Sequence, residues 1–390
     1  MTGHETALAT IGTPPSVSVR LNPFKKPDSE LPILKDAIPV PWCQDAYILS
    51  QRPVFTLHPL FHAGAYYVQD SSAMYVGHVF ERLCLEFRRP AVLDLCAAPG
   101  GKTTHASSIL RKHFGDDFTL VSNEVMRQRA SILSDNVAIW GDPNVAVTSA
   151  DPKIFGRQEG CFDMIIADVP CSGEGMFRKD PKAVEEWSEQ LVEICAARQR
   201  RIIADVWSSL REGGIMVYST CTFEEAENDA NLKWIADELG GEIIPLGEAP
   251  AGVRETEYGH MLVPGEVPGE GQWVGALRKT AASRARTIDI QSLRPLRCGC
   301  SRGVMKGGVL VPDPDWALSI KFDRTSYPCT AVDKQTALHF LHRDTIMLPD
   351  APFGYNVLTY RGLPIGFVKN LGSRCNNLHP QGRRIRMDIV

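Results

Sequence analysis

The sequence predicts an α/β protein whose central domain is a doubly wound, mainly parallel β-sheet. From Pro90 onward, short apolar runs alternate with helical patterns, and this alternation is typical of βαβ units. Three short strand patterns then predict an antiparallel edge to the same sheet. The predicted strands are 92–95, 119–122, 145–148, 162–167 and 215–219, followed at the antiparallel edge by 241–244, 259–263 and 272–277.

Helical patterns fill the intervals between these strands, as a doubly wound sheet requires. A further helix, predicted over 73–87, precedes the first strand of the sheet, and Ser71 or Ser72 is expected to cap it. The helices predicted within the sheet region are 104–113, 126–140, 181–210 and 224–239.

Length and composition indicate a globular protein with more than one domain. The 390 residues suit two or three domains, and no apolar run approaches the ~18 residues of a membrane helix. The 11 cysteines are odd in number and scattered, which favours reduced thiols in the cytoplasm over a disulfide framework. We expect an N-terminal subdomain at 1–75, a catalytic domain at 76–280 and a C-terminal α+β domain at 281–390. A linker is expected near 280–287.

Charge is distributed unevenly along the chain. The net charge is −4, but residues 284–390 contain 16 Lys and Arg against 8 Asp and Glu. This tail therefore carries +8 and the rest of the chain −12. A basic module on an acidic body is typical of nucleic-acid binding, although a solvated surface explains the same charge.

Two short segments, each containing a cysteine, carry the strongest functional signal. Cys171 lies in Asp168–Gly173 and Cys221 lies in Tyr218–Thr222, and each segment follows an apolar run that predicts a buried strand. Ligands of open α/β sheets bind outside the carboxyl ends of the strands. A single cysteine is more often a small buried hydrophobe. Two cysteines at equivalent strand ends, next to an aspartate, instead indicate thiols that take part in a reaction.

A loop of small residues after the first strand of the sheet, from Cys96 to Thr103, predicts a cofactor site. Such a loop lets a ligand approach the backbone, and the following helix offers free N–H groups. The loop lacks both the dinucleotide-binding and the Walker A spacing. Acids after successive strands favour a nucleoside-bearing cofactor, S-adenosylmethionine (SAM), with Glu124 on the ribose and Asp151 near the adenine amino group. The predicted cofactor-binding residues are Cys96, Ala97, Ala98, Pro99, Gly100, Gly101, Lys102, Glu124, Asp151 and Asp168.

Three motifs together resemble the Nol/Nop/Sun family of SAM-dependent RNA cytosine-C5 methyltransferases. They are DLCAAPGGKT at 94–103, DVPCSGEGMF at 168–177 and YSTCT at 218–222. The resemblance extends over 58–72, 178–181, 227–228, 366–370 and 376–377. It is nearest to bacterial RsmF-type enzymes, which act on 16S ribosomal RNA. The resemblance implies a Rossmann-like SAM-dependent methyltransferase domain, a small N-terminal RNA-binding subdomain and a C-terminal α+β PUA-like RNA-binding domain. It also implies a cytoplasmic monomer.

The resemblance assigns roles to the site residues. It implies that Cys221 attacks C6 of cytosine, that Cys171 resolves the adduct and that Asp168 holds the amino/N3 edge of the base. Lys102 either biases a nearby thiol toward thiolate or contacts RNA, and the alternative is an exposed lysine at a helix start. At position 229, the family often has Glu where this chain has Asp.

Other readings stay open at this stage. The substrate is alternatively transfer RNA, or the chain is a non-catalytic RNA-binding factor in ribosome assembly. DNA cytosine-C5 methylation would instead make Cys171 the nucleophile. Family members carry an extra helical stretch before the segment like 18–25, so this chain is expected to begin later than its relatives.

Aromatic and metal-binding candidates are weaker. Tyr66, Phe177 and Phe223 are candidates to stack on the target base, although each is more typical of a hydrophobic core. Cys298 and Cys300 have no second ligand pair at zinc-finger spacing, so no metal is expected.

Overall fold

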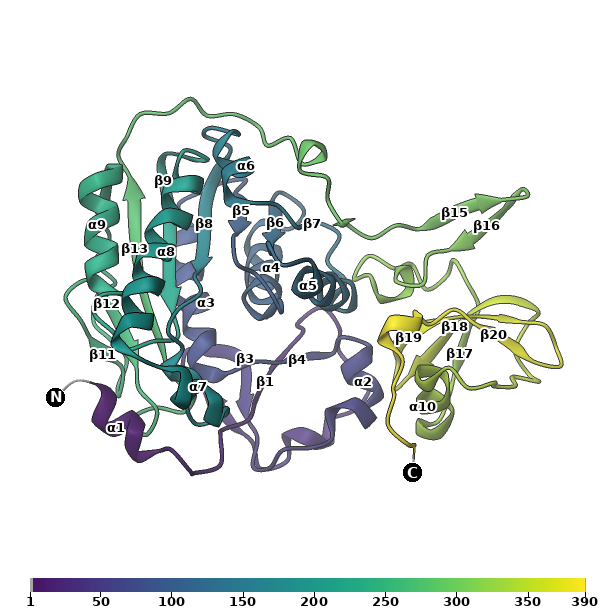
Figure 1. The fold of residues 1–390 in the computed structure, drawn as a ribbon. Helices are drawn as coiled ribbons and strands as arrows, with labels where there is room; N and C mark the ends of the chain where they lie inside the picture. Colours follow the sequence, from purple (N-terminus) through teal and green to yellow (C-terminus); the bar gives the residue numbers. More distant parts are fainter. Residues whose placement is uncertain (1–2, 390) are drawn as a thin grey trace.

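The computed structural model describes residues 3–389 and contains a central mixed sheet of ten strands. Its strand order is β11-β12-β13-β9-β8-β5-β6-β7-β14, with β10 paired to β13 (Figure 1). The five consecutive strands from β9 to β7 are parallel, which confirms the predicted Rossmann-like core. The strands are β5 (Ala91–Asp94), β6 (Thr119–Asn123), β7 (Val145–Thr148), β8 (Phe162–Asp168), β9 (Leu210–Thr220), β10 (Gly241–Ile243), β11 (Arg254–Glu255), β12 (Gly259–Leu262), β13 (Gln272–Lys279) and β14 (Arg297–Cys298).

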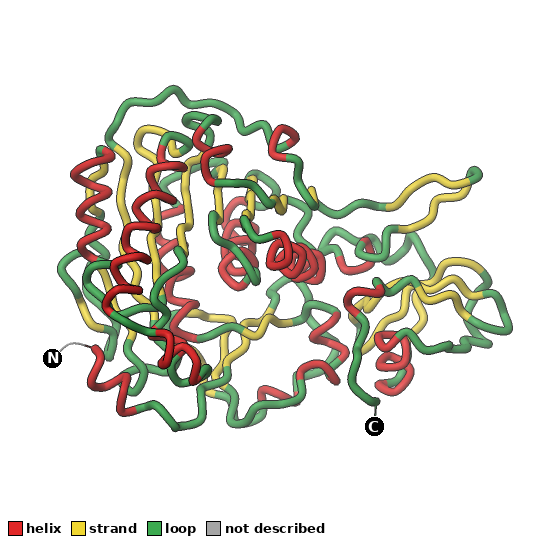
Figure 2. The backbone as a smooth tube through the Cα atoms, viewed as in Figure 1, coloured by secondary structure: helices red, strands yellow, loops and turns green. Residues whose placement is uncertain are grey.

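Helices cover both faces of this sheet, as Figure 2 shows in red against the yellow strands. One face packs against α3, α4 and α5, and the opposite face packs against α6, α8 and α9. Each face has its own cluster of fully buried aliphatic and aromatic side chains, so the sheet is apolar on both sides. The helices are α3 (Ser71–Cys84), α4 (Gly101–Phe114), α5 (Arg127–Trp140), α6 (Pro152–Gly156), α8 (Glu189–Trp207) and α9 (Asp229–Leu239).

Several helix boundaries differ from the sequence prediction, including those of α4, which starts three residues earlier than predicted, and α3, which ends three residues earlier. The helix predicted over 181–210 is two helices, α7 (Pro181–Glu186) and α8, because Trp187 is extended and the Ser188 hydroxyl caps α8. The cap of α3 is Asp70, whose carboxylate accepts the backbone N–H of Ser72, so both predicted serine caps are wrong. The helix predicted from 224 begins at 229, after a turn over 224–228.

The N-terminal region forms a four-stranded sheet of its own, in the order β2-β3-β1-β4. The alternation of residues 16–21 in the sequence predicts β1, but the other three strands are too short and too rich in proline to give a clear alternation. The elements are α1 (Gly3–Ala9), β1 (Ser18–Leu21), β2 (Ile38–Val40), β3 (Cys43–Ile48), α2 (Pro59–His62) and β4 (Tyr66–Val68).

The C-terminal region combines a four-stranded sheet with one helix and a projecting hairpin, β15–β16 (Figure 1). The sequence pattern over 334–342 predicts a helix and that over 354–360 predicts a strand, and both form. The elements are β15 (Gly303–Lys306), β16 (Val309–Pro312), β17 (Cys329–Ala331), α10 (Lys334–His342), β18 (Gly354–Tyr360), β19 (Leu363–Asn370) and β20 (Cys375–Asn377).

The two ends of the chain share one hydrophobic core. Val19 and Leu60 of the N-terminal region and Phe340 and Ile365 of the C-terminal region belong to a single buried cluster. The C-terminal region also returns to the central sheet, since β14 pairs with β7 through Arg297 and Val147. Neither contact was expected from the sequence. In the described residues, no helix is long and apolar enough to cross a membrane.

The shared core gives a stability prediction. Phe340 is fully buried, so Phe340→Ala leaves a cavity and should cost about 3–5 kcal/mol of unfolding free energy. Phe353→Ala is the matched control because that ring is 80% exposed, and its effect should be within ~0.5 kcal/mol. Urea unfolding followed by tryptophan fluorescence measures both, and equal effects would contradict a shared core.

Candidate active site

The structure brings the two predicted cysteines into contact. β8 and β9 are parallel neighbours, so the segments that follow them emerge at the same edge of the sheet. The Cys171 and Cys221 Sγ atoms are 3.1 Å apart, and the backbone N–H of Cys221 donates to the Cys171 Sγ at 3.3 Å. Both side chains are partly exposed, so the pair is accessible at the sheet edge.

Asp168 is held beside this pair by three donors. Its Oδ2 accepts from Lys102 Nζ at 2.9 Å, and its Oδ1 accepts from Ser219 Oγ at 2.8 Å and from Gln272 Nε2 at 3.2 Å. Gln272 Nε2 also donates to the carbonyl oxygen of Thr220, next to Cys221, at 2.7 Å. The sequence prediction missed Gln272, because only the antiparallel pairing of β13 with β9 brings it to this edge.

Burial and charge set the protonation of two of these groups. Burial opposes a charge on Lys102, but the charge of Asp168 and its hydrogen bond outweigh burial and raise the pKa of the ammonium. Lys102 is therefore a cation directed at Asp168. The hydrogen bond with Cys221 and then burial raise the pKa of the Cys171 thiol well above its ordinary value. Cys171 consequently keeps its proton at neutral pH.

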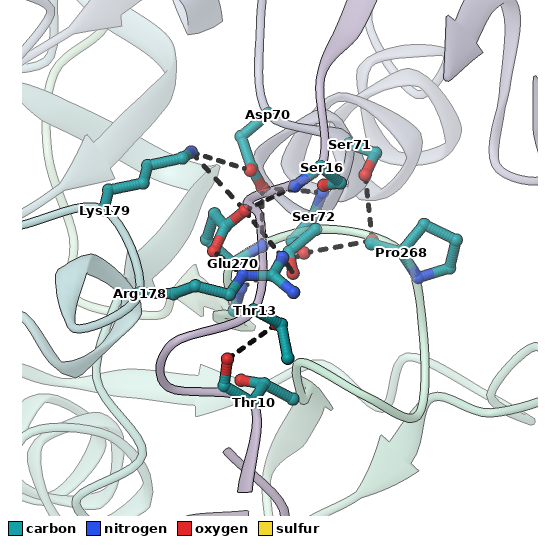
Figure 3. A network of polar contacts seen from close by, with 12 residues as sticks. Thr10, Thr13, Ser16, Asp70, Ser71, Ser72, Arg178, Lys179, Pro268 and Glu270 are labelled. Atoms are coloured by element: carbon teal, nitrogen blue, oxygen red, sulfur yellow. Dashed lines mark hydrogen bonds and ion pairs between the residues drawn. The ribbon is translucent and has the colours of Figure 1, made fainter. Parts of the chain in front are cut away.

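A network of ion pairs holds the far end of the loop that carries Cys171 (Figure 3). Arg178 donates to both carboxylate oxygens of Glu270 at 2.7 Å, and Lys179 Nζ lies 3.1 Å from Asp70 Oδ2. The backbone N–H of Ser16 donates to the same Glu270 at 3.2 Å. The network therefore ties the loop after β8 to the start of β13, to the cap of α3 and to the N-terminal segment.

The predicted cofactor loop runs between β5 and α4. Gly100 has φ of 115° and is the N-cap of α4, a conformation that favours glycine. Two side chains of α5 fix the loop backbone, because Arg129 donates to the carbonyl of Ala98 at 2.9 Å and Asn136 to that of Pro99 at 2.7 Å. A cleft opens along this loop and reaches Asp168. Its lining residues are Tyr67, Val68, Gln69, Asp70, Ala73, Cys96, Ala97, Ala98, Pro99, Gly101, Lys102 and Asp168.

The other two predicted acids occupy different surroundings. Glu124 is buried after β6, where it accepts from the backbone N–H of Met126 at 2.9 Å and pairs with Arg129 at 3.2 Å. Asp151 is exposed and caps α6 by accepting from the N–H of Lys153 at 3.0 Å. Among the described residues, neither lines the cleft, so their predicted contacts with ribose and adenine remain predictions.

A buried acid at the start of the loop fits a cofactor with a cationic or N–H donor group. Asp94, the last residue of β5, is fully buried, and its Oδ2 accepts from Thr103 Oγ1 at 2.6 Å. Its Oδ1 has no hydrogen-bond partner among the residues described. Burial raises the Asp94 pKa to about 7. The glycine loop, the cleft and this acceptor together suit SAM, which carries an ammonium group.

The aromatic candidates lie mainly in cores. Tyr66 is 1% exposed in the shared core and its hydroxyl is 2.7 Å from His58 Nδ1, while Phe223 is buried behind the central sheet. Phe177 is half-buried. Over residues 3–389, no group of three or more potential ligands is arranged to hold a metal.

Three family models match successive parts of the chain. Residues 85–246 match the model "16S rRNA methyltransferase RsmB/F", and residues 3–71 match "N-terminal domain of 16S rRNA methyltransferase RsmF". Residues 327–385 match "Methyltransferase RsmF PUA domain". Each matched part of the chain is similar to the corresponding part of RsmF-type methyltransferases. These matches confirm the resemblance predicted from the motifs, the PUA-like C-terminal domain and SAM as the cofactor of the methyltransferase domain.

The chain aligns with only part of the length of its curated relatives. The chain is 36% identical over 256 residues to the Escherichia coli K12 protein named "Ribosomal RNA small subunit methyltransferase F" and to that of Shigella sonnei. These alignments cover 63% of this chain and 52% of each relative. The chain therefore spans about half the length of the curated relatives that it matches.

Solved structures support the fold. The chain is 25% identical to a methyltransferase homologue from Pyrococcus horikoshii, with a TM-score of 0.56 over 70% of this chain and 88% of that one. NSun6 from Pyrococcus horikoshii, solved with the SAM analogue SFG, gives a TM-score of 0.59 at 18% identity over 71% and 94% of the two chains.

The raised pKa of Asp94 predicts a pH dependence of stability. Below about pH 4 the carboxyl is protonated in both the folded and the unfolded state. Between about pH 4 and 7 only the folded state keeps the proton, so the stability that this proton contributes is lost as pH rises through about 7. The stability of the protein relative to Asp94→Asn should therefore fall between pH 4.5 and 7.5, by up to ~4 kcal/mol. Urea unfolding at several pH values measures this, and parallel pH curves for the two proteins would contradict it.

The Arg178–Glu270 pair predicts a second stability effect. Glu270→Ala leaves a largely buried guanidinium without its carboxylate and should cost about 3–5 kcal/mol. Glu86→Ala removes the solvent-exposed partner of Arg278 and serves as the control, with a cost of about 0–1 kcal/mol. Thermal and urea unfolding measure the loss of stability in both variants. Similar losses would show that the network in Figure 3 does not stabilise the fold.

Proposed function

We propose that this protein transfers a methyl group from SAM to C5 of cytosine in RNA, through a covalent adduct between Cys221 and C6. The 16S ribosomal RNA is the proposed substrate, as the names of the matched family and relatives suggest. One observation carries the proposal: two cysteine sulfurs 3.1 Å apart follow β8 and β9 at the edge of the sheet where the paired Asp168 and Lys102 line the cleft along the predicted cofactor loop.

The chemistry explains why a thiol is needed. Cytosine C5 is a poor nucleophile, and a covalent route divides the difficult step into easier ones. The Cys221 thiolate forms a bond to C6, and the electron pair of the C5–C6 double bond moves through the ring so that C5 becomes nucleophilic. Asp168, 30% exposed at its side chain, accepts from the amino group of the base. Bound SAM supplies a methyl group on a sulfonium sulfur.

Release of the product reverses the addition. After C5 gains the methyl group, a base removes the C5 proton, the C5–C6 double bond forms again and the bond from C6 to Cys221 breaks. Cys171 is the proposed residue for this step, because its sulfur lies 3.1 Å from the sulfur that carries the adduct: its thiol gives its proton to the departing Cys221 sulfur, and the resulting Cys171 thiolate takes the C5 proton.

The substrate must present an unpaired or flipped cytosine, because attack at C6 needs access to the face of the ring. The N-terminal sheet and the C-terminal domain are the proposed RNA-binding parts, and the +8 charge of the tail suits phosphate contacts. The boundaries 1–75, 76–280 and 281–390 remain predictions, as do a monomeric state and action in the cytoplasm. No observation favours transfer RNA over ribosomal RNA.

The cysteine roles are tested by substitution. Cys221→Ala should abolish methylation of 16S RNA transcripts, measured by transfer of label from SAM and by bisulfite sequencing. Cys171→Ala should accumulate a covalent protein–RNA species on denaturing gels, because the adduct forms but is not released. Cys298→Ala removes an exposed cysteine of β14 and is the control that should behave as wild type.

Two outcomes would decide against the proposal. A covalent species that is lost in Cys171→Ala and kept in Cys221→Ala would assign the nucleophile to Cys171, as in DNA cytosine methylation. A wild-type protein that binds RNA but shows no SAM binding by calorimetry would favour a non-catalytic assembly factor.

A further inference from the structure

Two adjacent residues, Glu227 and Asn228, lie beneath the cysteine pair. They occupy the turn that precedes α9, and both side chains are fully buried. Buried polar groups are expected to be hydrogen-bonded, and the choice of partners shows what they hold in place. Here the partners are the residues next to the two cysteines.

Asn228 fixes both neighbours of Cys221. Its Oδ1 accepts from the hydroxyl of Thr220 at 2.5 Å, and its Nδ2 donates to the carbonyl oxygen of Thr222 at 3.0 Å. One side-chain amide therefore contacts both the residue before the cysteine and the residue after it. Asn228 thus helps to set the position of the Cys221 sulfur, together with Gln272, which donates to the carbonyl oxygen of Thr220.

Glu227 has the equivalent relation to Cys171. Its carboxylate accepts from the hydroxyl of Ser172 at 2.5 Å and from the backbone N–H of Ser172 at 3.2 Å. It also accepts from Gln199 Nε2 at 2.6 Å, and the same Nε2 donates to the carbonyl of Pro170 at 3.0 Å. Glu227 and Gln199 together therefore hold the residues before and after Cys171.

The two halves of this arrangement are joined. The hydroxyl oxygen of Tyr218 lies 2.8 Å from the backbone carbonyl oxygen of Glu227 and 3.0 Å from Gln199 Oε1, and its single proton is within reach of both acceptors. The hydroxyls of Ser172 and Thr222 are 2.9 Å apart, which links one cysteine loop to the other. The side chains of this network are buried, so water competes little for the bonds between them.

We propose that Asn228 and Glu227 are positioning residues with separate tasks: Asn228 aligns Cys221 for adduct formation, and Glu227 aligns Cys171 for adduct release. The inference rests on the proposed function, because it assigns each residue to one step of that reaction. Small errors in the placement of reacting atoms slow a step strongly, so loss of either support should affect mainly the step of the cysteine that it holds.

Single-turnover kinetics on 16S RNA distinguish the two tasks. Asn228→Asp keeps the size of the side chain but loses the donor to Thr222, and it should slow adduct formation by about tenfold or more. Its rate of adduct decay should stay within about threefold of wild type. Glu227→Gln should show the reverse, so that the covalent protein–RNA species accumulates as expected for Cys171→Ala.

Matched controls separate positioning from loss of folding. Asn356 is a buried asparagine of β18 that donates to two backbone carbonyls, and Asp142 is a buried carboxylate paired with Arg111. Asn356→Asp and Asp142→Asn should lower the unfolding temperature but leave both rates, measured at saturating RNA, unchanged. Unfolding temperature and SAM binding are recorded for all four variants.

The rate of disulfide formation with a thiol oxidant reports on the geometry of the cysteine pair and does not depend on methylation. Diamide takes two electrons and two protons from Cys171 and Cys221 as the disulfide forms, and the rate depends on the distance between the sulfurs. Both Asn228→Asp and Glu227→Gln should form this disulfide several-fold more slowly than wild type and than the two controls, as measured by mass spectrometry.

The outcomes are distinguishable. Equal slowing of formation and decay in both variants, or wild-type rates of disulfide formation in both, would overturn the positioning roles. If the wild-type protein forms no adduct even with RNA that contains 5-fluorocytosine, the proposed function fails. In that case the disulfide rates still decide whether Glu227 and Asn228 set the geometry of the pair.

Discussion

The register between β8 and β9 is the constraint on which the site depends. Asp168 lies opposite Ser219 in this parallel pair, so Cys171, three residues later, meets Cys221, two residues after Ser219. A slip of one residue would turn the side chains of one strand to the other face of the sheet. The apolar residues on both faces prevent such a slip, since they are buried under helices on both sides. The hydrophobic core therefore fixes the chemistry at the edge.

The loops beyond this edge are held by buried polar groups instead of apolar packing. Glu227 and Asn228 hold the residues next to the cysteines, and Glu270 holds the end of the Cys171 loop through Arg178. Each of these groups is desolvated, and the loss of one partner would leave another buried and unpaired. Such networks are costly to disturb, so they keep two thiols and one carboxylate in fixed relative positions.

The three parts of the chain act as one structural unit. Arg20 of β1 donates to the carbonyl of Gly101 and to Thr104, so the N-terminal sheet supports the helix that follows the cofactor loop. Lys25 bridges the carbonyls of Ala63 and Ile139 and joins the same sheet to the end of α5. The C-terminal domain completes the core of the N-terminal sheet. RNA bound to either terminal region would thus contact parts that pack against the catalytic domain.

Local sequence patterns were enough to predict the alternation of strands and helices and to identify the family motifs and the two cysteines. Local periodicity and short motifs are properties of neighbouring residues, so they can be read without the fold. Only the folded structure shows that Gln272 reaches Asp168, that Asn228 contacts both neighbours of Cys221 and that Asp151 caps α6. It also decided the shared core of the two chain ends. These contacts join residues far apart in the chain, and strand register and helix packing, which no single segment encodes, set their distances.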